Sequence, residues 1–280
     1  MAQNEVDMKR TAVLLAPSLL LCSCGAVYSW QAIPADSHRT GVKATTADNV
    51  TEALGSVVGA DYHAPNGAEF QDGCTPAVAR LLIEAQPSMR ELKQVIGYSP
   101  KALMRTSPEC ELYDFAADVI LAQGTLLFGE KMDVSILNKG GVRTDIPKGE
   151  ILLDDIISMF PFNNYLCLIR VPGSRLREVF TQMAETGPQV IGGARIAIEG
   201  DRLVSVEIGG EPLDDERIYN LVSIDFLLNG GDHYFLSKDA VEVVRSQMLV
   251  RDAIIPAVKR FALESKPFEY PTDGRVHITK

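Results

Sequence analysis

Apolar and polar residues recur along the chain in two different periods, which predict helices and strands in an irregular order. Apolar spacing of three or four residues predicts helices over 75–96 (one helix, or two broken near Pro87), 109–127, 151–159, 174–185 and 252–263. Runs rich in β-branched residues predict strands over 133–137, 165–171, 195–199, 203–208 and 218–226. Because a hairpin around Gly200 and Asp201 interrupts any regular strand–helix–strand rhythm, we expect an α+β fold with mixed or antiparallel sheets layered with helices.

The amino-terminal residues have the pattern of an export signal. The basic start Met8-Lys9-Arg10 precedes an apolar run over 11–21 that is too short to span a bilayer. The next residues, Leu21 to Cys24, resemble a bacterial lipobox, whose cysteine becomes lipid-modified. We therefore expect a lipoprotein signal peptide over 1–23 and a lipid on Cys24; the alternative is a cleaved secretory peptide with incidental cysteines. Either interpretation predicts that the protein leaves the cytoplasm, and the first places it in the cell envelope, lipid-anchored in the periplasm or outer membrane.

After this signal the chain divides by composition into two further parts. Residues 24–66 are small, polar and weakly periodic, which predicts a tether and an irregular arm, and 67–280 form the predicted folded domain. Of the five cysteines, Cys110 and Cys167 are expected to be buried as small apolar residues rather than joined in a disulfide.

Composition and charge exclude several classes of function. The chain carries 27 Lys and Arg against 37 Asp and Glu, a net charge of −10, which disfavours general binding to nucleic acid. Neither a GxGxxG nor a GxxxxGK[ST] run is present, so no dinucleotide or P-loop site is indicated. Without a CxxC pair, and with only four His, the sequence predicts no metal site and no cofactor.

Three segments bring together residues that could recognise a ligand. The run Asn138 to Arg143 (Asn-Lys-Gly-Gly-Val-Arg) follows a predicted strand, so its glycines let a ligand approach the backbone and its arginine suits an anion. Phe160 to Asn164 is Phe-Pro-Phe-Asn-Asn, and Phe226 to Tyr234 joins an aromatic ring, a Gly-Gly turn and a carboxylate. Taken singly, each is equally well a tight turn or a corner of the core.

In this order, the three segments resemble the carboxy-terminal domain of the 5′-nucleotidase family. Two more runs add to the resemblance, Ile146 to Ile151 and, near the end, Asp273 to His277. Upstream, Glu109 to Asp118 is similar to a diverged form of the Glu-Ser helix of that family, with Tyr113-Asp114 in place of Gly-Asn. The arrangement also looks like stand-alone lipoprotein versions of the domain from Bacteroidetes-type bacteria.

The resemblance implies roles for individual residues. It places the rings of Phe162 and Phe226 on the two faces of a base, Asn138 against the base, Asp232 against the ribose and Arg143 against ribose or phosphate. The remaining expected binding residues are Gly140 and Gly141 in the turn, and Arg105, which lies slightly out of register with an arginine that the family uses.

The resemblance also implies a function and a partner. It indicates a nucleotide- or nucleoside-recognition domain, the substrate-binding part of a split nucleotidase whose metallophosphoesterase half is a separate chain. On its own such a domain is expected to be inactive. The alternatives are a non-catalytic nucleotide- or sugar-phosphate-binding lipoprotein, and a structural relic whose pocket no longer binds.

Overall fold

The computed structural model describes residue 45 and residues 48–279. The predicted signal peptide, the lipid site Cys24 and most of the predicted tether lie outside the described residues. Within the described part, no helix combines the length and apolar character needed to cross a bilayer.

The first described elements form a small sheet with two helices. Helix α2 (Val50–Leu54) precedes the antiparallel strands β1 (Ser56–Val58), β2 (Asp61–His63) and β3 (Glu69–Phe70), and helix α3 (Thr75–Ala85) follows them. The expected irregular arm thus contains regular structure in its described part. A domain boundary between residues 66 and 67 would divide this sheet, because β2 pairs with β3 across it.

One predicted helix ends earlier than its apolar pattern suggested. After α3 comes a 3-10 turn over Gln86–Met89, so the chain does break near Pro87, and β4 (Val95–Ser99) then continues as a strand. The helix expected up to residue 96 is therefore wrong at its end. Strand β4 pairs antiparallel with β6 (Gly149–Leu152), and this pairing, which the local sequence does not encode, outweighs the helical spacing.

A five-stranded mixed sheet forms the centre of the main body. Its order is β13 (Glu242–Leu249), β7 (Tyr165–Pro172), β12 (Ile218–Ile224), β5 (Val134–Leu137) and β8 (Val190–Gly192). Strands β12 and β5 run parallel, whereas the other neighbours are antiparallel. The predicted α+β class with mixed sheets is confirmed.

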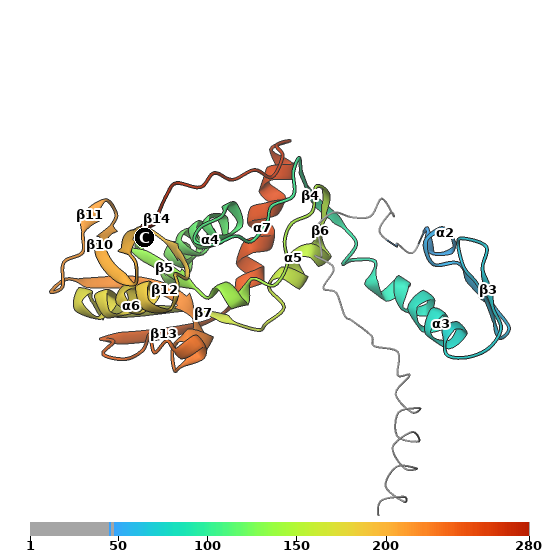
Figure 1. The fold of residues 1–280 in the computed structure, drawn as a ribbon, viewed down its shortest axis with the longest axis horizontal. Coiled ribbons are helices and arrows are strands. Elements are labelled where there is room, and N and C mark those ends of the chain that lie inside the picture. Colours follow the sequence, from blue (N-terminus) through green and yellow to red (C-terminus); the bar gives the residue numbers. More distant parts are fainter. Residues whose placement is uncertain (1–44, 46–47, 280) are drawn as a thin grey trace, which may run out of the picture. The chain divides into compact units, whose positions relative to one another are not determined.

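Helices cover this sheet and enclose the core. Helix α4 (Glu111–Phe128) packs on β8 and β5, and α7 (Val250–Leu263) lies beside α4 (Figure 1). Helix α5 (Leu153–Met159) contacts α7, and α6 (Gly173–Thr186) packs on β7. The free thiols of Cys110 and Cys167 are both buried, as expected.

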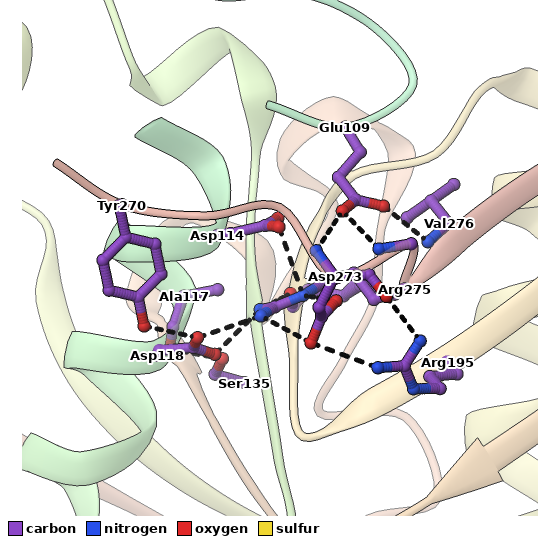
Figure 2. Close-up of polar contacts among 12 residues, drawn as sticks. Glu109, Asp114, Ala117, Asp118, Ser135, Arg195, Tyr270, Asp273, Arg275 and Val276 are labelled. Atoms are coloured by element: carbon purple, nitrogen blue, oxygen red, sulfur yellow. Dashed lines mark hydrogen bonds and ion pairs between the residues drawn. The ribbon is translucent and has the colours of Figure 1, made fainter. Parts of the chain in front are cut away.

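A second sheet contains the predicted hairpin and receives the end of the chain. Strands β9 (Ala194–Glu199) and β10 (Arg202–Ile208) form the hairpin, with β11 (Glu211–Pro212) on one side. On the other side β14 (Val276–Thr279) pairs parallel with β9. The segment that leads into β14 thereby returns to the start of α4, where a cluster of charged residues forms (Figure 2).

Candidate functional site

Asn138 begins the site at the end of β5, where the central sheet opens into a turn. Its side chain is almost completely buried, and its Nδ2 donates a hydrogen bond of 2.7 Å to Oδ2 of Asp232. Its Oδ1 is buried and has no hydrogen-bond partner among the residues that the structure describes. A Cβ at residue 141 would lie 2.6 Å from this oxygen, so any larger residue there would displace the amide from its present position. Asn138 therefore keeps a buried acceptor that the chain does not satisfy.

The second half of the site is a strained turn that presents an aromatic ring. Phe226 lies in the 3-10 turn Asp225–Leu227 directly after β12, and a Cβ at Gly231 would lie 2.7 Å from atoms of its ring. Asp232 and His233 both have left-handed backbone, with φ of 47° and 65°. Such backbone costs a non-glycine residue of order 1 kcal/mol or more. The turn holds Asp232 against Asn138 and leaves the ring of Phe226 44% exposed.

A pocket opens beside Asn138 and is lined mainly by apolar side chains. It encloses about 290 Å³ of space, part of it open to solvent. Its lining residues are Leu137, Asn138, Gly141, Val142, Phe160, Phe162, Asn164, Ile224 and Val250. Phe162 is 48% exposed, so a flat apolar face and a residue with an unpaired, buried acceptor line one cavity. This combination suits a planar heterocycle that carries a donor.

Arg143 brings a positive charge to the rim of this pocket. Its backbone N–H donates to the carbonyl of Met159, and its Nη1 donates to the carbonyl of Gly140 at 3.1 Å. The guanidinium carbon lies 5.9 Å from the centre of the Phe162 ring. A cation over an aromatic face is attracted by the ring electrons, which keeps the charge beside the pocket.

Arg105 lies behind the same turn. Its Nε and its backbone N–H both donate to Asp145 Oδ1, at 2.8 and 2.9 Å, and its Nη1 donates to the carbonyl of Val142 at 2.9 Å. The structure thus brings Asn138, Gly141 and Phe162 together in one cavity, with Gly140, Arg143 and Asp232 attached to them by direct contacts. Phe226 does not line this cavity and lies against Gly231, the residue before Asp232, whereas Arg105 contacts the loop at Val142 and Asp145 and does not line the cavity either.

Residues 95–238 match the family model of the 5′-nucleotidase, C-terminal domain. This chain belongs to that family. It is 27% identical over 215 residues to an apyrase of Tabanus yao, a match that covers 66% of this chain and 38% of the apyrase. It is 24% identical over 197 residues to the 5′-nucleotidase of Homo sapiens, covering 61% of this chain and 34% of that protein.

A solved structure agrees with the family assignment. The 5′-nucleotidase precursor of Thermus thermophilus superposes with a TM-score of 0.65 and 26% identity, covering 78% of this chain and 45% of that one. This 5′-nucleotidase C-terminal domain therefore has the fold of its family. The chain spans only about two fifths, or less, of the curated relatives it matches, so their activities as whole proteins do not transfer directly.

Sequence reasoning passed over Lys139 within the run it singled out. The backbone N–H of Lys139 donates to Oε1 of Gln189, and its Nζ donates to the hydroxyl of Ser107 at 3.1 Å and lies 5.7 Å from the centre of the Tyr113 ring. Burial lowers the pKa of Lys139 from its usual value. This lysine ties the turn of the 5′-nucleotidase domain to the start of α4, and its position inside the Asn-Lys-Gly-Gly run was the available signal.

A second polar cluster lies between α4 and the carboxyl end of the chain (Figure 2). Arg275 makes a two-pronged contact with Asp118, at 2.8 and 2.9 Å, and also donates to Asp273 and to the carbonyl of Ile191. Glu109 accepts three backbone N–H groups, from Asp273, Gly274 and Val276. These bonds fasten β14 and the segment before it to the start of α4.

The acids of this cluster are close enough to suggest a cation site. Glu109, Asp114 and Asp273 bring carboxylate oxygens within 4.8 Å of one another. The Nε of Arg275, however, lies 3.5 Å from Asp114 Oδ2 and 3.0 Å from Asp273 Oδ1, so a guanidinium already supplies positive charge there. Burial is the largest cause that raises the pKa of Asp114, to about 8, with Arg275 opposing it and Glu109 adding to it. The raised pKa means that Asp114 holds a proton at neutral pH, which lowers the repulsion among the acids.

Proposed function

We propose that this 5′-nucleotidase C-terminal domain binds a nucleoside or nucleotide in the pocket beside Asn138. The observation that carries the proposal is the buried Oδ1 of Asn138, which has no partner among the described residues and belongs to a residue that lines the same cavity as the half-exposed Phe162. A base carries both a face that stacks on an aromatic ring and donors along its edge. The base lies against Phe162 and Phe226, and its edge meets Asn138.

The charged groups around the pocket suit the rest of such a ligand. Asp232 presents a carboxylate next to Asn138 and accepts hydrogen bonds from sugar hydroxyls. Arg143, beside Phe162, binds phosphate or the ribose. Family membership supports this arrangement, since all these residues lie within the segment that matches the family model.

A finer proposal concerns the wider assembly. We infer that the chain is the substrate-binding part of a split nucleotidase, with the metallophosphoesterase half on another polypeptide, and that a lipid on Cys24 anchors it in the cell envelope. In these relatives the matched segment makes up less than half of the protein, so the domain occurs there together with further sequence. The alternative is a binding lipoprotein without a hydrolytic partner.

Two measurements test these proposals. The purified chain is expected to leave AMP intact with added Mn²⁺, and hydrolysis that copurifies with the chain would contradict a catalytic half on another polypeptide. Mass spectrometry of the mature amino terminus tests the lipid.

Calorimetric titration with adenosine and AMP tests the binding site. Phe162→Ala removes a ring whose stacking on a base is worth roughly 1–3 kcal/mol, so affinity should fall about tenfold or more. Since the ring is half exposed, the stability of the fold should change little. Phe70→Ala is the matched control, because that ring is similarly exposed but lies in the small sheet. A folded wild type that binds no nucleoside or nucleotide would remove the proposed function and leave the fold intact.

A further inference from the structure

Three successive residues of the turn that carries Phe162 accept hydrogen bonds from the start of α7. Arg251 donates from Nη1 to the carbonyl of Phe162 at 3.4 Å and from Nη2 to Oδ1 of Asn163 at 2.8 Å. The next residue, Asn164, accepts a backbone hydrogen bond of 3.1 Å from Val250. A segment 88 residues away in the sequence thus holds one wall of the pocket.

Packing alone does not hold this turn. Phe162 is 48% exposed and Asn163 is exposed as well, so neither side chain is fixed by the core. The planar guanidinium of Arg251 donates two hydrogen bonds in a fixed fork, which sets the position of two neighbouring residues at once. The backbone of Phe162, and with it the direction of its ring, therefore depends on Arg251.

We propose that Arg251 is a positioning residue of the nucleotide pocket, which holds the ring of Phe162 where a base can stack on it. The identity of the ligand rests on the proposed function, whereas the role of Arg251 in positioning the Phe162 turn does not. Arg251 acts through the turn: its neighbour Val250 lines the cavity, and both terminal nitrogens of Arg251 donate to the turn itself. Arg143, by contrast, is the guanidinium that lies over the ring.

Binding experiments separate positioning from direct contact with a phosphate. Arg251→Ala should lower the affinities for adenosine and AMP by the same factor, about threefold to tenfold, which is the effect of losing one or two hydrogen bonds. Arg251→Lys, which still offers one donor, should recover part of the loss. Arg260→Ala on the same helix is the control, because that side chain is exposed and pairs only loosely with Glu264, at 3.9 Å. A loss for AMP that greatly exceeds the loss for adenosine would overturn the positioning role.

A partner variant tests whether the contact itself is responsible. Asn163→Ala removes one acceptor of Arg251 and should weaken both ligands, though less than Arg251→Ala does. Because the two side chains act through one contact, the double variant should lose less than the product of the two single losses. Two losses that multiply would show that Arg251 acts independently of the turn and would overturn the proposal.

A ligand-free measurement keeps the inference distinct from the proposed function. The chain has a single tryptophan, Trp30, so Phe162→Trp in a Trp30→Phe background places one fluorophore on the turn. Time-resolved anisotropy should show a larger nanosecond wobble of that ring when Arg251→Ala is added, and no change with Arg260→Ala. A larger wobble without any nucleoside binding would retain the positioning role and remove the nucleotide. Unchanged wobble together with unchanged affinity would overturn the positioning role and retain the nucleotide.

Discussion

Two polar clusters in this molecule contain similar residues but differ in how far their polar atoms are paired. In the Arg275 cluster (Glu109, Asp114, Asp118, Asp273 and Arg275) the guanidinium is only 7% exposed and bonds to two carboxylates and a carbonyl. In the pocket cluster (Asn138, Arg143, Phe162 and Asp232) a buried amide oxygen has no partner and an aromatic ring stands half in solvent.

The difference distinguishes a structural role for the Arg275 cluster from the binding role that we propose for the pocket cluster. The Arg275 cluster pairs most of its donors and acceptors within the chain. Asp114 Oδ2 has no hydrogen-bond partner among the described residues, but it lies 3.5 Å from the Nε of Arg275, so the cluster stabilises the fold and has little left to offer a ligand. The pocket cluster leaves the Oδ1 of Asn138 unpaired among the described residues and holds Asp232 in left-handed backbone. Both features lower the stability of the free protein, and a bound ligand would offset that loss. The two clusters carry equally conspicuous sequence runs, Asp273 to His277 and Asn138 to Arg143, so only the geometry distinguishes them.

The largest loss of stability is expected when the Arg275 cluster loses its guanidinium. Arg275→Ala leaves Asp114, Asp118 and Asp273 facing one another, and breaking a buried ion pair costs about 3–5 kcal/mol. Urea unfolding should show this loss of stability. Arg195→Ala is the control: that side chain is 50% exposed and pairs with Asp273 at 3.3 Å, so its removal should cost about 1 kcal/mol or less. Equal losses for the two variants would show that the cluster is not a stabilising unit.

A smaller effect with a distinct pH dependence is expected from Asp114→Asn. Burial raises the pKa of Asp114 to about 8, whereas an unfolded aspartate titrates near 4. Between these two pH values the folded chain holds a proton that the unfolded chain has lost, so this group's contribution to stability falls as pH rises and levels off above about 8. Asparagine does not titrate and still offers Glu109 a donor.

The measurement is urea unfolding of wild type and Asp114→Asn between pH 5 and 9. As pH rises, the free energy of unfolding of the variant should increase relative to that of the wild type. The slope of this difference should approach about 1.4 kcal/mol per pH unit, and the total change between pH 5 and 8 should be roughly 2–4 kcal/mol. Parallel stability curves would mean that Asp114 is ionised in the folded chain.

Local patterns predicted the long elements of the fold and missed the short or exposed ones. The strands over 165–171, 195–199 and 203–208 appear almost as expected, because one face or both are buried and the apolar pattern records it. At strand β4 the pattern predicts the end of a helix, since the apolar residues of the strand continue the helical spacing before it. Strand β13 was not predicted, because it is the exposed edge of the sheet and its first four residues all face solvent.

For the candidate site, the family resemblance supplied the residues and the structure supplied their relations. Nothing local indicates that Arg105 pairs with Asp145, 40 residues away, or that Arg251 holds a turn 88 residues away. Such contacts depend on which elements the sheets bring together. The orphaned oxygen of Asn138 likewise exists only because Gly141 and Asp232 enclose the amide.

The smallest of these effects is expected in the pocket cluster, from Asp232. Asp232→Ala removes a carboxylate that accepts sugar hydroxyls, so adenosine should bind about tenfold more weakly and the gap to 2′-deoxyadenosine should narrow. Stability should fall by about 1–3 kcal/mol, because alanine fits a φ of 47° poorly and the buried Nδ2 of Asn138 loses its acceptor. Asp239→Ala is the control for the backbone, an exposed acid at φ 57° whose loss should lower stability slightly and leave binding unchanged. Asp232→Asn keeps an acceptor for Asn138 and tolerates the backbone, so it separates charge from conformation. Calorimetry that finds the ribose-to-deoxyribose gap unchanged in Asp232→Ala would place the sugar elsewhere and leave the pocket open only to the base.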